Sequence, residues 1–396
     1  MLKRSAWLAS SLCALSLALS SCESEQQTVA PKAPPFVFRS LELRQKQPTG
    51  ERDWDLTSPE ARYEFTRRLV RAKTPVGVLY RNNKPAYRIS ALRATVINDG
   101  VVVLLEGDVK IQQLLGQKVL MKGDRLRWTP ADALLVMEQR PEAIDRRTRI
   151  KSTRAQFNQR SQDLTMFGIV QLERWRTQEG LKQGKHAESV VRAHQTLWNL
   201  GSGVLKAKGP VLGQHRGPAH KILHQLHASR LEGNTLQGFL DLIAPVKVLA
   251  PVQKGRLDAS TTRWLFNDDA LVSDSRFTGS MKQSQLFGDA FRIAMGDSTL
   301  NVPRGCRLEQ PGDRLLARTC LWNWDTNAVT ARGNVELTRT ANKQITRSDH
   351  LDGTVGENGT VVFSSPGGRV YSELNIKDHQ GVRSSEGGSR RSPVSF

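Results

Sequence analysis

The strongest constraint on the fold is a short strand motif that returns along the chain. In its clearest copy, residues 101–111, an apolar run is followed by the pair Gly107 and Asp108 and then by alternating apolar and polar residues. Looser copies lie at residues 166–170, 231–235, 277–281 and 331–335. A strand unit that recurs in this way predicts stacked hairpins, in which each unit packs on its neighbours, and not a single globular core.

A second repeated pattern supports the same architecture. An aromatic residue is followed seven positions later by an aliphatic residue, and often by glycine eleven positions after the aromatic. The full pattern holds at Phe157, Trp198 and Trp322, and its first two positions hold at Trp128 and Trp264. Each copy is typical of a strand, a four-residue turn and a second strand, in units of about 30 residues. We therefore predict an all-β chain.

Three segments carry signals for other structures. Residues 59–72 begin like a helix and keep helical spacing, although two short strands around a polar turn fit them equally well. Residues 187–199 are compatible with a short helix, and residues 209–220 contain Gly, Pro and His in the manner of a loop.

The charge balance points to an anionic partner. The formal net charge is +20 and the pI is near 10.2. Nucleic acid, a membrane surface, and a phosphorylated or acidic glycolipid are the classes that such a balance favours. Under the simpler interpretation, most of the Lys and Arg excess forms a solvated outer face.

The N-terminal residues predict export. Two basic residues precede an apolar stretch over residues 6–19, which is too short for a confident transmembrane helix, and the sequence Leu-Ser-Ser then leads to Cys22. This order resembles the bacterial lipoprotein signal, so we expect a signal peptide over residues 1–21, a lipid on Cys22 and a proline-containing tether over residues 22–35. The alternative is an ordinary secretory signal. Export argues against nucleic acid as the partner.

Two cysteines remain for the folded part of the chain. Cys306 and Cys320 lie nearly symmetrically about a turn signal at residues 310–313. On a hairpin they would face each other across the ladder, and an oxidising compartment permits the bond, so we predict a disulfide. The alternative is a pair of free buried thiols.

Familiar catalytic and cofactor motifs do not occur in the sequence. The one cluster to weigh is His215, His220, His224 and His227, in which two histidines would share a face on a helix, as metal ligands can. A carboxylate or cysteine to complete a metal site is not close by in the sequence, and a basic, solvated loop explains the cluster as well. We predict no catalytic residue, no metal and no cofactor.

The inward-facing side chains are the candidates for binding an apolar ligand. By alternation along the opening motif, Val103, Leu105, Val109 and Ile111 face inward. The aromatic residues of the second pattern join them as groove candidates: Trp128, Phe157, Trp198, Trp264 and Trp322. Such residues either pack between two sheets or line an open groove for a lipid, and the sequence leaves both open.

The N-terminal part of the chain resembles a known family. The residues that carry the resemblance are Trp54-Asp55-Leu56, Ala61, Tyr63, Pro75, Tyr87-Arg88-Ile89, Ala91, Ala94 and Leu105-Glu106-Gly107-Asp108-Val109. In this order, behind a membrane anchor, they resemble LptC, the periplasmic component of the lipopolysaccharide export machine. The later repeats resemble the wider OstA-type β-repeat that LptC shares with its partner LptA. The resemblance favours strands over a helix at residues 59–72.

The resemblance implies a fold and a function. The fold is an elongated β-taco, a twisted open jellyroll of stacked antiparallel hairpins, with an LptC-like domain over residues 36–175, further repeats over 176–377 and a disordered tail over 378–396. The implied function is a membrane-anchored bridge that carries the acyl chains of lipopolysaccharide, or of a related glycolipid, toward the outer membrane. The implied partners are an ABC transporter of the LptB, LptF and LptG type and an LptA-like protein, joined by edge-strand addition.

Two departures from the family and two other functions are kept in view. LptC usually has a transmembrane helix where this chain has Cys22, and this chain is about twice as long. We expect an inner-membrane lipoprotein that faces the periplasm, with sorting to the outer membrane left open. The alternative is a scaffold lipoprotein with a filled β-core that binds protein or glycan on its outer face. A third possibility is an enzyme acting on envelope glycans, for which the sequence shows no carboxylate cluster.

Overall fold

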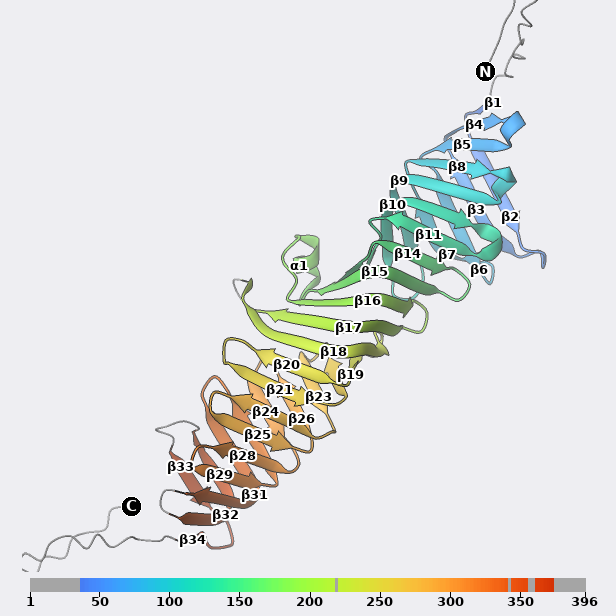
Figure 1. Cartoon of the computed structure of the whole chain (residues 1–396). Helices are drawn as coiled ribbons and strands as arrows, with labels where there is room; N and C mark the ends of the chain where they lie inside the picture. The colour runs from blue at the N-terminus through green and yellow to red at the C-terminus, as the bar shows by residue number, and fades with distance from the viewer. Residues whose placement is uncertain (1–35, 218–219, 341–342, 355–359, 374–396) are drawn as a thin grey trace, which may run out of the picture. The chain divides into compact units, whose positions relative to one another are not determined.

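The described part of the chain is built almost entirely from antiparallel β-strands (Figure 1). The computed structural model describes residues 36–217, 220–340, 343–354 and 360–373. Strand pairing joins these strands into one continuous sheet that is folded into two walls, which we call wall A and wall B. Wall A contains these strands in order of pairing, in addition to halves of the long strands given below: β1 (Phe36–Phe38), β4 (Glu60–Glu64), β5 (Leu69–Lys73), β8 (Arg93–Ile97), β11 (Leu134–Gln139), β14 (Arg154–Asn158), β19 (Phe239–Ile243), β22 (Thr262–Leu265), β23 (Ala270–Ser273), β26 (Phe291–Ala294), β27 (Thr299–Val302), β30 (Thr319–Asn323) and β33 (Val361–Ser364).

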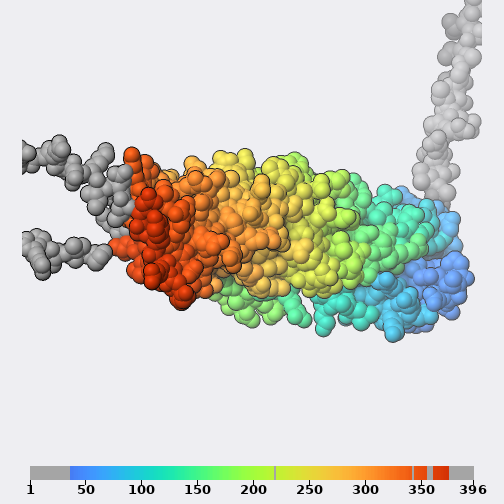
Figure 2. All heavy atoms as spheres, turned by 90° about the horizontal axis from the view of Figure 1, so that it is seen from below, coloured from blue at the N-terminus to red at the C-terminus, as the bar shows by residue number. Residues whose placement is uncertain are grey.

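Wall B is built in the same way from the strands that alternate with these along the chain. Its own strands are β2 (Leu41–Lys46), β3 (Arg52–Ser58), β6 (Val76–Arg81), β7 (Lys84–Ser90), β12 (Glu142–Ile144), β13 (Thr148–Lys151), β20 (Val246–Ala250), β21 (Gly255–Ala259), β24 (Phe277–Met281), β25 (Ser284–Gly288), β28 (Cys306–Gln310), β29 (Asp313–Ala317) and β34 (Tyr371–Glu373). The strands of both walls form one compact unit, and its successive parts follow one another in sequence order (Figure 2).

Eight long strands belong to both walls, with one half in each. They are β9 (Val102–Gln113), β10 (Leu120–Thr129), β15 (Asp163–Arg174), β16 (Ser189–Asn199), β17 (Val204–Arg216), β18 (Ile222–Asn234), β31 (Ala328–Arg339) and β32 (Gln344–Thr354). Elsewhere the chain crosses between the walls in short links. We call this closed side the spine, and the opposite side, where the hairpin turns of both walls lie, the rim.

The glycine of the repeated motif marks the point where a long strand bends from one wall to the other. Gly107, Gly168 and Gly333 all have positive φ, at +76°, +82° and +75°. Ladder register shifts beside all three: opposite Gly107 between Gly123 and Arg125, and between Phe167 and Val170 and between Arg332 and Val335. Positive φ is open to glycine at little cost, which allows the strand to turn without breaking its ladder. The looser copies at residues 231–235 and 277–281 lack this feature, and their glycines lie in straight strand segments.

The second sequence pattern corresponds to pairs of residues that face each other across the hairpins of wall A. The pairs are Trp128 with Leu135, Phe157 with Leu164, Trp198 with Leu205, Trp264 with Leu271, and Trp322 with Val329. Further pairings link these into one inward row along wall A, for example Leu135 with Phe157 and Leu300 with Trp322. Aromatic and aliphatic side chains opposite each other stabilise adjacent strands, so the pattern records a packing requirement of every hairpin.

Two expected departures from strand structure are wrong. Residues 187–199 were expected to allow a helix but form β16, in which burial alternates along the strand: Thr196 and Trp198 are buried and Leu197 between them is exposed. Most of residues 209–220 continue β17 and do not form a loop. Residues 59–72 form β4 and β5 around a short 3₁₀ turn, as the resemblance favoured. The one α-helix among the described residues is α1 (Gln178–Lys182), in the link between β15 and β16.

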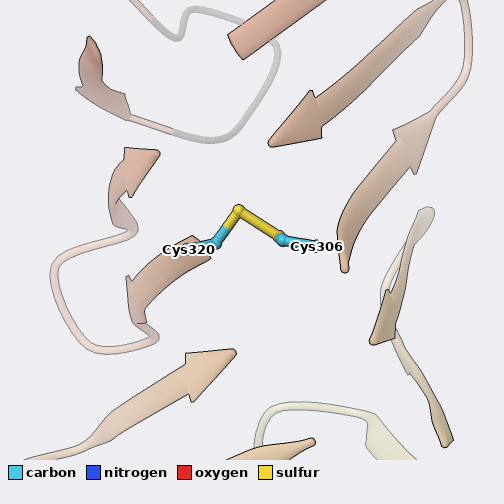
Figure 3. Close-up of a disulfide and its surroundings, with 2 residues drawn as sticks. All are labelled: Cys306 and Cys320. Carbon is cyan, nitrogen blue, oxygen red and sulfur yellow. A yellow bond between two sulfur atoms is a disulfide. The ribbon is translucent and has the colours of Figure 1, made fainter. Parts of the chain in front are cut away.

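Cys306 and Cys320 form a disulfide, but not across a hairpin (Figure 3). On the hairpin of β28 and β29, Cys306 faces Ala317, and Cys320 lies on β30 of wall A, opposite Val302 and Ala331. The expected geometry was therefore wrong: the chain crosses between walls after Ala317, so the bond joins wall B to wall A near the spine. Both cysteines are buried, and their Cα atoms are 5.9 Å apart.

Several expectations fall outside the described residues. These are the signal peptide at residues 1–21, the lipid anchor at Cys22, the tether at residues 22–35 and the tail at residues 378–396. Within the ranges that the structure describes, no helix has the length and apolar character needed to span a membrane.

Candidate functional site

The space between the walls is filled in the N-terminal half of the unit. Val103, Leu105, Val109 and Ile111, the predicted inward-facing residues of β9, are at most 1% exposed. Large side chains meet across the gap in edge-to-face contacts: the ring centroids of Trp54 on β3 and Trp128 on β10 are 5.1 Å apart, and those of Tyr87 on β7 and Phe157 on β14 are also 5.1 Å apart. Such contacts hold the two walls together over this half.

Hydrogen bonds across the rim close the same half. The side-chain amides of Gln113, the last residue of β9, and of Gln117, in the wall B turn after it, donate to the main-chain oxygen of Leu200 in a wall A turn, at 3.5 Å and 3.4 Å. Gln162 of wall A donates to the hydroxyl of Tyr87 of wall B at 3.0 Å. This half of the interior is therefore packed with side chains and is covered at the rim by hydrogen bonds between the walls.

The C-terminal half contains an apolar cavity between the walls. About 90 Å³ of it is free for small molecules, and it adjoins a second space of about 50 Å³, with which it shares His224, Val248, Leu271 and Met295. Both spaces are partly open to solvent, so the cavity is a narrow apolar cleft between the walls. We call the two together the inter-wall cavity. Its further apolar lining comes from wall A at Leu242, Trp264, Ile293, Leu300, Trp322 and Trp324, and from wall B at Val191, Leu226, Ala250, Leu257, Met281, Leu286 and Leu308.

The cavity exists because wall B changes the size of its inward side chains. In the filled half, wall B presents Trp54 and Tyr87 to the aromatic residues of wall A. Along the cavity its inward side chains are aliphatic or small, as at Ala250, Gly255 and Gly279, and the aromatic contact between Phe277 of wall B and Phe291 of wall A lies outside the cavity lining. Small residues opposite large ones leave space that no side chain fills.

The nine predicted groove residues are thus divided between the two halves. Trp264 and Trp322 line the inter-wall cavity, and the other seven lie in the filled half or at its end, where Trp198 is 2% exposed. The sequence reasoning missed most of the cavity lining, including Leu271 and Leu286. The sequence signal that marks the cavity is a set of Ala, Gly and Ser residues at inward positions of wall B, opposite the wall that contains the aromatic row.

Two histidines are among the polar residues of the cavity wall. His215 on β17 and His224 on β18 face each other as ladder partners, with ring centroids 5.9 Å apart. Burial away from water lowers the pKa of both, and for His224 burial and the neighbouring His215 lower it to about 4. Ser189 lies within hydrogen-bonding distance of His215, at 3.2 Å. Both histidines are therefore neutral near pH 7, and the cavity stays apolar.

The predicted histidine cluster does not assemble as a group. His227 lies further along β18. His220 lies before the start of β18 and has a positive φ. Among the residues that the structure describes, no group of three or more His, Cys, Asp or Glu side chains has the arrangement of a metal site.

The fold and its interior define a class of protein: a two-walled antiparallel jellyroll with an apolar space between the walls, the architecture known as a β-taco. Residues 5–171 match the family model for lipopolysaccharide assembly, LptC-related. This match supports assignment of the chain to the LptC family through its N-terminal part. The inter-wall cavity lies C-terminal to the matched residues. No curated protein matches the chain.

Assignment to the LptC family implies involvement in the lipopolysaccharide transport bridge of the cell envelope, with a periplasm-facing component of that system as the general role. The partners that the family implies in general are lipopolysaccharide and other components of the transport system. The family is one of transport proteins and is not known as a family of enzymes.

Proposed function

We propose that this protein is a membrane-anchored bridge component that holds lipopolysaccharide acyl chains, or those of a related glycolipid, in its inter-wall cavity. The observation that carries the proposal is an apolar cavity lined by both walls, in a fold whose N-terminal part matches the LptC family. Leaving a CH₂ group in water costs about 0.8 kcal/mol, so one twelve-carbon chain costs about 10 kcal/mol. Cover for such chains is therefore the main physical requirement of transport between membranes.

The proposal assigns different work to the two halves. Residues 36–175 form the LptC-like domain, and residues 176–377 continue the stack and hold the cargo. The lipoprotein signal ending before Cys22 and the tether over residues 22–35 would anchor the unit at the inner membrane, on its periplasmic side. Energy for movement of the lipid comes from the ABC transporter of the LptB, LptF and LptG type, not from this chain.

Free strand edges support docking to neighbours by strand addition. Among the described strands, β1 pairs only with β4, and β33 pairs only with β32. On β1, Phe36, Val37 and Phe38 are 60%, 58% and 42% exposed. An exposed apolar edge strand invites pairing with another chain. We assign β1 to the transporter side and the C-terminal edge to an LptA-like partner.

The experiment that tests this function is site-specific photo-crosslinking in cells. A crosslinking amino acid at Leu271, which lines the cavity, should capture lipopolysaccharide, whereas the same residue at Val272, the next position on β23, should not. A second pair compares Leu105 with Leu104 in the filled half. Depletion of the protein should make lipopolysaccharide accumulate at the inner membrane. Equal capture at Leu271 and Val272, or unchanged export after depletion, would refute the proposal.

A scaffold function has one specific observation in its favour. The filled half, with Trp54 packed on Trp128, is the packed core that a scaffold lipoprotein would have. If crosslinkers in the inter-wall cavity capture no lipid while outward positions capture protein or glycan, the scaffold function replaces the transport function.

A further inference from the structure

Two arginines meet at the rim where the filled half ends and the inter-wall cavity begins. Arg147, in the link between β12 and β13, and Arg174, at the end of β15, both belong to wall B. Both donate to the same oxygen, Oδ1 of Asn267 in a wall A turn, at 3.0 Å and 3.2 Å. Two positive groups are thus held side by side across the rim by one neutral acceptor.

The other hydrogen bonds of this pair also go to neutral oxygens. Arg147 donates to the main-chain oxygen of Arg176 at 3.2 Å, and Arg174 donates to the hydroxyl of Thr148 at 3.0 Å. The guanidinium of Arg174 also lies 4.3 Å from the ring centroid of Phe266. These bonds fix the direction of both guanidinium groups without cancelling their charge.

The nearest carboxylates are turned to other groups. One Asp145 oxygen accepts the main-chain N–H groups of Arg147 and Thr148, at 3.0 Å and 2.7 Å. Asp269 lies 4.0 Å from Nε2 of His215. Burial and the neighbouring charge of Arg147 lower the pKa of Arg174 to about 10, and the opposing attraction of Asp145 and Asp269 is too weak to offset them.

The pair lies in a hollow that is open to solvent. About 540 Å³ of space is bounded by Asp145, Arg146, Arg147, Arg174, Asn267 and the turns on either side of the rim. The hollow also includes Gly116 of wall B and Gly201 of wall A. A multi-atom anion therefore has room beside the two guanidinium groups.

The hollow is adjacent to the inter-wall cavity on both walls. In wall B, Arg174 is the ladder partner of Ser189, which lines the cavity. In wall A, Trp264 lines the cavity and Asn267 follows it by three residues in the same hairpin. A molecule with an apolar tail in the cavity would therefore bring a polar head to this part of the rim.

We propose that Arg147 and Arg174, positioned by Asn267, bind the phosphate group of an acidic amphiphile whose acyl chain occupies the inter-wall cavity. Paired guanidinium groups match phosphate oxygens in charge and in hydrogen-bond geometry. This inference rests on the proposed function and adds the head-group site to it. It also gives a specific use to two of the many positive charges of the chain.

The test measures binding of three probes to the full chain by isothermal titration calorimetry: dodecyl phosphate, dodecanol and inorganic phosphate. The test variant is Arg147→Gln with Arg174→Gln. The matched control is Arg127→Gln with Arg332→Gln, two exposed arginines on outward positions of wall A that change the net charge equally. Circular dichroism checks that both variants are folded.

The expected result is that the test variant binds dodecyl phosphate roughly tenfold more weakly, the loss expected for charge-assisted hydrogen bonds at a partly solvated site, and binds dodecanol unchanged. The control should match the wild-type protein with both amphiphiles. Equal weakening for dodecanol, or no change for dodecyl phosphate, would overturn the head-group site alone. Wild-type protein that binds neither amphiphile would overturn the proposed function as well. Inorganic phosphate that binds as tightly as dodecyl phosphate would show a site for free anions and overturn the amphiphile proposal.

Discussion

The bend at Gly168 offers the sharpest test of how this fold is built. Gly168 has φ of +82°, and a Cβ added there would lie 2.1 Å from Oγ1 of Thr153. That hydroxyl cannot easily move, because it donates to the main-chain oxygen of Phe167 at 2.9 Å. Gly168→Ala should therefore cost both the backbone penalty of positive φ and the penalty of a close contact.

The magnitude follows from these two parts. A left-handed conformation costs a residue with a Cβ about 1–2 kcal/mol, and overpacking costs about 1–3 kcal/mol. We expect Gly168→Ala to lower the free energy of unfolding by about 2–5 kcal/mol. Gly312→Ala is the control for the backbone part, because Gly312 has φ of +85° and no atom within 4 Å of an added Cβ. It should cost about 1–2 kcal/mol.

The assay is urea unfolding followed by circular dichroism for both variants, and for Gly168→Ala in a Thr153→Ala background. Removal of the Thr153 hydroxyl should reduce the cost of Gly168→Ala to about that of Gly312→Ala. If Gly168→Ala and Gly312→Ala are equally destabilising in the native background, the bend is not closely packed and the reasoning is wrong.

Three further predictions concern the C-terminal half and its comparison with the filled half. Replacement of both Cys306 and Cys320 by Ala should lower the free energy of unfolding by about 3 kcal/mol, as expected for a 14-residue separation, and reducing agent should then have no further effect on the urea midpoint. The lowered pKa of His224 means that the unfolded chain takes up a proton first on acidification. The stability that neutral His224 contributes is therefore complete above its ordinary pKa of 6.5 and is lost as the pH falls toward 4. His224→Gln should remove at most about 3 kcal/mol of that pH dependence in unfolding measured from pH 8 to pH 4, and an unchanged profile would contradict the assignment. Trp128→Ala, in the filled half, should lower the free energy of unfolding in urea by about 3–5 kcal/mol. Trp322→Ala, beside the cavity, should lower it by less than half of that amount. Equal costs would mean that the two halves are packed alike.

The sequence was sufficient to predict the hairpins of wall A. Each aromatic residue of the second pattern faces the aliphatic residue seven positions later, as between Trp128 and Leu135. This succeeds because a four-residue turn sets the register of a hairpin, so a local spacing becomes a spatial contact.

The relation between the two walls was not predictable in the same way. The disulfide was expected across a hairpin, but Cys306 and Cys320 lie on different walls, because the chain crosses the spine between them. Alternation assigns a side chain to the inner face and does not say how far away the opposite wall lies. That distance depends on the size of the side chains that both walls present to the cavity, such as Gly279 of wall B and Leu271 of wall A, which are not ladder partners.

The inward row of wall A places a limit on how such a chain can change in length. As many residues separate Trp264 from Ile293 as separate Ile293 from Trp322, and all three occupy equivalent positions in that row. One such interval adds two strands to each wall, which is about 10 Å of stack at the usual strand spacing. Insertion or deletion of a whole interval keeps every inward side chain inward, whereas a change of one residue within a strand reverses the faces beyond it. The length of the stack of strands can therefore change only in whole steps of about 10 Å if the inward row is to be kept.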